Sequence, residues 1–213
     1  MSGLSRPRIL LHICCAPDAT VVIERLASDY RLTGFFYNPN IHPEEEYSRR
    51  LGETIRLAEG LDFPLFLGDY DPVNWFSLVR GFEGEPEGGT RCEICIRMRL
   101  ERTAALARDE GFTAFSTVLT VSPHKQAPFI NRVGAEVAAR HGLSFFGADF
   151  KKKDGFKRSL ELSKRHGLYR QKYCGCIYSL EEREASKGVG RGPVPALGPD
   201  PPKVGAPEVS PYA

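Results

Sequence analysis

The sequence predicts an α/β fold built on a doubly wound parallel sheet. Two observations lead to it: short apolar runs recur along the chain, and most are followed by a segment with the spacing of an amphipathic helix. Strands that alternate with helices of this length are typical of parallel βαβ units. With 213 residues, of which 41% are hydrophobic, the chain can bury one sizeable core.

The elements of the first half follow one another without long loops. The run RILLHI (8–13) predicts a buried strand, the turn CCAPD follows it, and Asp18 is a candidate N-cap for a helix reaching about Asp29. Prolines and asparagines mark 38–43 as a loop, since both residue types favour turns. The other elements expected here are strands at 32–37 and 63–67 and helices at 44–61 and 72–80.

The second half begins with a segment, 81–90, whose glycines and proline indicate a loop. Beyond it we expect a helix from Cys92 to about Glu110, then strands at 113–119 and 143–146 and helices at 124–141, 154–166 and 178–185. Residues 1–185 then form a single domain. In 186–213, twelve of 28 residues are Pro or Gly. This segment lacks the apolar surface that offsets the entropy of ordering, so it is expected to be a disordered tail.

The charge distribution indicates an anionic partner. The net charge is only +2, from 29 Lys and Arg against 27 Asp and Glu, but nine basic and two acidic residues lie between Lys151 and Lys172. Such a local patch favours an anion-binding face, although a solvated Lys-rich helix gives the same pattern. The chain has no apolar run of membrane-spanning length and no signal-peptide pattern, so we expect a cytoplasmic protein without a membrane partner.

Six cysteines occur as three close pairs, which favours metal or redox chemistry over a disulfide framework. Cys14 and Cys15 follow the first strand, at the sheet edge where ligands bind in α/β folds. Adjacent thiolates suit a multinuclear metal centre, although two small buried residues are an equal alternative.

The other two pairs have more specific spacings. Cys92 and Cys95 lie one turn apart at a helix N-terminus, which favours thiolates and predicts zinc, an iron–sulfur cluster or a redox dithiol. Between Cys174 and Cys176, Gly175 permits a tight turn and a labile, exchangeable pair. Four cysteines could therefore ligate a cluster while two exchange. A structural zinc site is the competing account of the first four.

Six sequence blocks, in order, resemble the QueH-type epoxyqueuosine reductases: LLHICCAPD (10–18), YNPNIHPEEEY (37–47), RCEICIRMRL (91–100), FSTVLTVSPHK (115–125), DFKKKDG (149–155) and YRQKYCGCIYS (169–179). The resemblance implies an oxidoreductase that removes the epoxide oxygen of epoxyqueuosine at the wobble position of tRNA to give queuosine. It also implies a Rossmann-like fold similar to the adenine-nucleotide α-hydrolase (HUP) group. The first loop, CCAPD, lacks the glycines of a pyrophosphate-binding loop, which argues against ATP use.

Site residues follow from the resemblance one by one. It implies a 4Fe-4S cluster on Cys14, Cys15, Cys92 and Cys95, and a redox-active disulfide between Cys174 and Cys176. The tRNA substrate gives the basic patch a purpose, with contacts expected from Lys151, Lys152, Lys153, Arg170 and Lys172. The electron donor is not identified.

Asp18 has three candidate roles. It lies next to Cys14 and Cys15 in sequence, so it is a candidate general acid or a ligand of an additional mononuclear iron, besides the helix N-cap. Tyr37, His42 and Tyr173 are the next candidates for the acid, whereas His12 in its apolar strand is interpreted as a core residue. Two other functions compete: an ATP-dependent tRNA thiolase with a cluster, and a non-catalytic zinc module that binds RNA.

Overall fold

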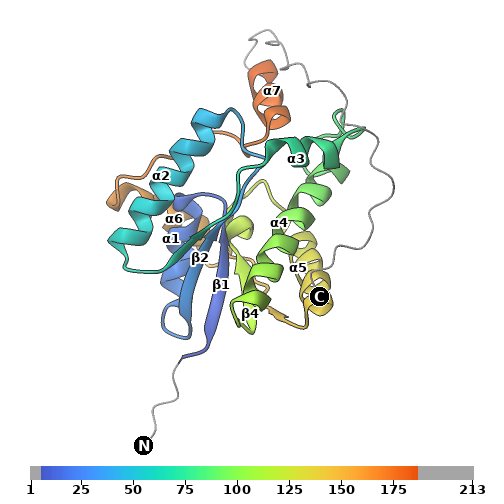
Figure 1. Cartoon of the computed structure of the whole chain (residues 1–213). Coiled ribbons are helices and arrows are strands. Elements are labelled where there is room, and N and C mark those ends of the chain that lie inside the picture. Colours follow the sequence, from blue (N-terminus) through green and yellow to red (C-terminus); the bar gives the residue numbers. More distant parts are fainter. Residues whose placement is uncertain (1–5, 187–213) are drawn as a thin grey trace, which may run out of the picture.

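The computed structural model describes residues 6–186 and shows a parallel sheet between two helical layers (Figure 1). The strand order is β3-β2-β1-β4-β5, and every pair is parallel. The strands are β1 (Arg8–Ile13), β2 (Arg31–Phe36), β3 (Leu65–Leu67), β4 (Ala114–Thr117) and β5 (Ser144–Phe145). The predicted doubly wound α/β fold is thereby confirmed.

Alternation along the central strand β1 decides which helices cover which face. Leu10 points to a layer formed by α4 (Thr90–Asp109) and α5 (Ala127–His141). Leu11 and Ile13 point to the opposite layer, formed by α1 (Ala16–Leu26), α2 (Glu44–Gly60) and α6 (Gly155–Arg165). Because successive side chains of a strand face opposite sides, one apolar run supplies both cores.

Two shorter helices complete the fold. Helix α3 (Pro72–Val79) packs on α4, and α7 (Ile177–Ser186) lies at the end of the molecule opposite the start of β1 (Figure 1). Ser186, where the tail was expected to begin, still belongs to α7, and 187–213 lie outside the described residues. Among the described residues, no helix is long and apolar enough to cross a membrane.

Two predicted boundaries beside the site differ from the structure. Helix α1 begins at Ala16 with Cys15 as its N-cap, so the prediction of Asp18 as the cap is wrong. Pro17 in the first turn explains the earlier start, since a missing N–H is tolerated there. Strand β4 stops at Thr117, whose hydroxyl accepts a hydrogen bond from the Leu119 N–H at 3.2 Å and turns the chain into a short 3-10 helix, η1 (Val118–Val121).

The strand order reverses between β1 and β4. Chain segments leaving the carboxyl ends of these two strands diverge, which opens the crevice where α/β sheets bind ligands. The segments that border it are Cys14 and Cys15 after β1 and η1 after β4.

Candidate active site

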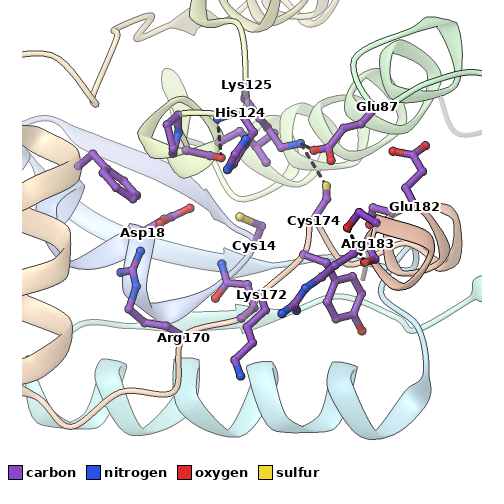
Figure 2. Close-up of a pocket in the computed structure, with 18 of the residues that line it drawn as sticks. Cys14, Asp18, Glu87, His124, Lys125, Arg170, Lys172, Cys174, Glu182 and Arg183 are labelled. Carbon is purple, nitrogen blue, oxygen red and sulfur yellow. Dashed lines mark hydrogen bonds and ion pairs between the residues drawn. The ribbon is translucent and has the colours of Figure 1, made fainter. Parts of the chain in front are cut away.

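A pocket of about 450 Å³ opens at this crevice (Figure 2). Its volume lies in the range of roughly 300–1,000 Å³ that is usual for small-molecule sites. Four separate stretches of the chain line it: the start of α1, the α4 region, the segment after η1, and the segment from α6 to α7. The residues used below are Cys14, Asp18, Glu87, Arg99, Lys125, Phe156, Arg170, Lys172, Tyr173 and Cys174.

Cys14, Cys15 and Asp18 form a compact group at the start of α1. One ligand atom of each lies within 4.8 Å of the others, which is close enough to hold a metal ion. The Cys14 and Cys15 sulfurs are 3.9 Å apart, and their shared hydrogen bond lowers the pKa of Cys14 and raises that of Cys15. Burial raises the pKa of Asp18, although Arg170 opposes the effect. The Gln171 amide donates to the Cys15 sulfur at 2.9 Å.

The other four cysteines gather at a second, small cavity. Cys92, Cys95, Cys174 and Cys176 all line it, together with Asn40, Trp75, Arg91, Arg99 and Lys125. The pairs that resembled a cluster motif in the sequence are thus divided: Cys92 and Cys95 lie with Cys174 and Cys176, whereas Cys14 and Cys15 lie with Asp18. All six cysteines are free thiols.

Burial dominates the thiol chemistry of this cavity. It raises the pKa of Cys92, although the Gly88 N–H and Lys125 favour the thiolate. Burial and the neighbouring Cys174 raise the pKa of Cys176 to about 12. A bound metal reverses this preference, since a coordinated thiol loses its proton.

Arg50 fixes the Cys174–Cys176 turn from helix α2. Its guanidinium pairs with Glu46 at 2.7 Å and donates to the carbonyl oxygens of Cys174 at 2.9 Å and Tyr173 at 3.2 Å. Gly175 has φ +131°, and a Cβ there would meet Arg50 at 3.0 Å. The glycine is therefore required both by its backbone and by the close approach of Arg50.

Two cations lie beside the sulfurs, the partly buried Lys125 and the buried Arg99. The Lys125 ammonium lies 3.1 Å from the Cys174 sulfur and 3.6 Å from the Glu87 carboxylate (Figure 2). Burial alone would lower the pKa of Lys125, but Cys174 and Glu87 outweigh it and raise that pKa. Arg99 is 2% exposed, and no carboxylate among the described residues pairs with it. It donates to the Cys95 carbonyl oxygen at 3.2 Å.

This donor set fits a metal–thiolate centre. Four sulfurs at one cavity match the ligands of zinc or of an iron–sulfur cluster, and both groups carry negative charge when bound by four thiolates. Burying Arg99 without a counter-ion is costly, and an anionic centre would offset that cost. The group formed by Cys14, Cys15 and Asp18 offers a different set of ligand atoms, two sulfurs and one oxygen.

The basic patch divides between the pocket and its surroundings. Arg170 and Lys172 line the pocket, and Arg170 lies 5.7 Å from the Phe156 ring. Lys152 and Lys153 are exposed, and their carbonyl oxygens accept hydrogen bonds from Arg25 of α1. Lys151 pairs with Asp149 and donates to the Lys125 carbonyl oxygen, both at 3.0 Å.

The remaining candidates have distinct positions. His12 is fully buried between Thr117 and the Tyr37 carbonyl oxygen, and burial lowers its pKa to about 3, so its interpretation as a core residue is confirmed. Tyr173 lines the pocket, whereas Tyr37 and His42 do not. The sequence analysis missed the roles of Lys125, Arg99 and Arg50. Arg99 follows Cys95 by one helical turn, which is a signal that was available.

A parallel α/β sheet with cysteines and buried cations at its switch point defines the class of metal- or thiol-dependent enzymes of Rossmann-like architecture. Comparison with known proteins narrows the class to a family. The family model for epoxyqueuosine reductase QueH matches residues 9–182, and the chain belongs to this family.

Curated relatives agree over most of their length. Epoxyqueuosine reductase QueH of Acinetobacter baylyi is 44% identical over 179 residues, which cover 82% of this chain and 81% of the relative. The Streptococcus pyogenes protein of that name is 42% identical, covering 83% and 71% of the two chains. The Thermotoga maritima protein is 39% identical, covering 82% and 91%.

Proposed function

We propose that this protein is an epoxyqueuosine reductase that converts epoxyqueuosine at the wobble position of tRNA to queuosine. The observation that carries the proposal is that all six cysteines lie around the pocket and the small cavity beside it, which share Arg99, Lys125 and Cys174, in a chain that belongs to the QueH family. The reaction takes two electrons and two protons, and the oxygen leaves as water. A tRNA substrate implies a cytoplasmic enzyme. The electron donor stays unidentified.

The pocket suits a nucleotide from a single-stranded loop. An anticodon base can leave its stack and enter a protein pocket, where aromatic and arginine planes hold it. Phe156 and Arg170 offer such planes in the wall. Lys172 at the rim is placed for a phosphate, and such contacts position the substrate rather than select it.

Two cofactor assignments are proposed for the cysteines. The resemblance assigns a 4Fe-4S cluster to Cys14, Cys15, Cys92 and Cys95 and leaves Cys174 and Cys176 as an exchangeable disulfide. The geometry favours another division, in which Cys92, Cys95, Cys174 and Cys176 hold the cluster and Cys14, Cys15 and Asp18 hold a mononuclear iron. Two observations support the second: the shared cavity and the 4.8 Å grouping. In either case an iron–sulfur cluster would supply electrons one at a time.

The protein's own groups would handle the proton and the charge. An alkoxide is a poor leaving group, so the epoxide oxygen must be protonated or bound to a cation. In the assignment that leaves Asp18 without iron, Asp18 suits a proton donor, because it is buried in the pocket wall beside Cys14 and burial raises its pKa. The Lys125 ammonium stabilises negative charge on Cys174. Arg170 and Lys172 keep the pocket wall cationic.

Activity on tRNA that carries epoxyqueuosine tests the function. The protein, purified without oxygen, is expected to yield queuosine with a chemical reductant and without ATP, as nucleoside analysis of the digested tRNA would show. An absolute requirement for ATP would support a thiolase instead. Colourless, iron-free protein that binds tRNA without turnover would support the zinc module.

Iron and sulfide analysis separates the two cofactor assignments. If the cluster lies on Cys14, Cys15, Cys92 and Cys95, then Cys14→Ser loses cluster iron and Cys174→Ser keeps it. If it lies on the four cysteines of the small cavity, Cys174→Ser loses the cluster and Cys14→Ser keeps it. Cys95→Ser is the common control, because Cys95 is a ligand in both assignments.

A further inference from the structure

Trp75 carries a polar group that the protein leaves unused. The side chain is 1% exposed on α3, yet its indole nitrogen has no hydrogen-bond acceptor among the described residues. The His42 ring lies 5.4 Å away, but its Nε2 atom is likewise without a partner, so the histidine does not accept a hydrogen bond from the indole N–H. A buried donor left without an acceptor is destabilising, and such groups usually mark an absent ion or water.

The position of Trp75 identifies the missing acceptor. Its ring packs in one cluster with Cys95, Cys176 and Val79 and lines the small four-cysteine cavity. Two other residues of the same cavity also have a buried unpartnered atom, the Asn40 side-chain oxygen and the Arg91 Nε. The remaining hydrogen bonds of Arg91 are made, to the carbonyl oxygens of Phe82 and Glu83 and to Glu182. Three buried polar atoms without a hydrogen-bond partner therefore belong to residues that line the four-cysteine cavity.

We propose that the indole N–H of Trp75 donates a hydrogen bond to a sulfur of the metal–thiolate centre in this cavity and thereby raises its reduction potential. A donor to sulfur stabilises the more negative, reduced form of a centre more than the oxidised form. The inference rests on the proposed function only in requiring such a centre. It holds for either cofactor assignment, because both include Cys95.

Trp75 is also the only tryptophan of the chain. The protein therefore has a single indole N–H signal in a proton NMR spectrum, and that signal reports on this cavity alone. Zinc is a suitable diamagnetic probe because it binds four thiolates without redox chemistry. No assignment experiment is needed to identify the signal.

The first test is a redox titration of Trp75→Phe, which keeps an aromatic ring in place and removes the donor. Protein purified without oxygen is expected to retain its iron and sulfide while its midpoint potential becomes more negative than that of the parent. Phe76→Leu is the matched control, since the Phe76 ring meets Trp75 edge to face, with ring centroids 5.0 Å apart, but has no donor. An unchanged potential in Trp75→Phe, or an equal shift in Phe76→Leu, overturns the proposal.

The second test needs no variant at position 75. Adding zinc ions to the metal-free parent protein is expected to move the indole signal downfield. If the centre lies on the four cysteines of the small cavity, the same shift is expected in a Cys14→Ser, Cys15→Ser double variant. A signal that stays in place when the thiols have bound zinc overturns the proposal. Neither test measures turnover, so loss of the reductase activity with both results intact would reject the proposed function alone.

Discussion

The charged residues on the two sides of the pocket differ in their exposure and in their partners. One side of the pocket is formed by α1 and α6, and we call it the helical wall. On these helices Arg158, which does not line the pocket, is 34% exposed and bound to Glu24 at 2.7 Å and Glu161 at 3.0 Å. The other side, the cysteine wall, is formed by α4, the segment after η1 and the Cys174–Cys176 turn. There Arg99 is buried, and Lys125, which is 12% exposed, lies 3.1 Å from the Cys174 sulfur.

The difference separates stability from function. Exposed ion pairs such as those of Arg158 contribute little and cost little. A buried cation without a full counter-ion is expensive, and a protein that needed only stability would carry an apolar residue there. The cysteine wall therefore keeps charges that serve chemistry, whereas the helical wall keeps charges that hold helices together. Substitutions on the two walls should differ accordingly.

The largest effect is expected at Lys125. Lys125→Met removes the cation between Cys174 and Glu87 while keeping the length of the side chain, and reductase turnover should fall about 100-fold, as when one preorganised electrostatic group is lost. Lys157→Met, an exposed position on α6, is the control and should leave the rate unchanged. Equal rates in the two variants would remove the distinction between the walls.

Asp18 should give the next largest effect. Because it is not the N-cap of α1, Asp18→Asn should keep the helix, the thermal stability and tRNA binding while turnover falls by about tenfold to 100-fold. Circular dichroism, tRNA binding and single-turnover rates measure these quantities. A parental rate would direct the search for the acid to Tyr173, the one of its three alternatives that lines the pocket.

The exposed lysines beside the pocket should show a smaller, salt-dependent effect. Lys152→Gln with Lys153→Gln should weaken tRNA binding several-fold and reduce the slope of log affinity against log salt by roughly 1.4 to 1.8, since each phosphate contact contributes about 0.7 to 0.9. The control is the double variant Arg31→Gln with Arg108→Gln. These residues lie at the start of β2 and in the last turn of α4, the ends of these elements that point away from the pocket. If both double variants have the parental slope, the lysines are merely solvated.

The smallest effect is expected for Glu24 on the helical wall. The hydrogen bond from Arg158 lowers the pKa of Glu24, so the pair stabilises the fold fully above the ordinary glutamate value of 4.5 and loses this contribution as pH falls through the lower folded value. Glu24→Gln should therefore reduce the free energy of unfolding by about 0.5 kcal/mol at neutral pH and by nothing well below that range. Urea unfolding at several pH values measures the difference.

Local patterns predicted the elements better than the site. Apolar runs and helical spacing identified all five strands and seven α-helices of the described chain, because each pattern lies within one segment. They placed Cys14 and Cys15 at the sheet edge where α/β folds bind ligands, and Cys92 and Cys95 at a helix N-terminus. The sequence could not decide which cysteines meet, since that depends on how the turn at Gly175 lies against Arg50 of α2. The burial of Lys125 was equally hidden, because lysine is ordinarily exposed.

The pocket draws on both ends of the folded chain, from Cys14 to Arg183, and this fixes when the protein can become active during its synthesis. Strand β1 leaves the ribosome early, but Cys174 and Cys176 follow some 160 residues later, which at roughly 5–20 residues per second takes on the order of ten seconds. Until then the early cysteines have no partners from the C-terminal turn. The complete site therefore assembles only near the end of the synthesis of each molecule.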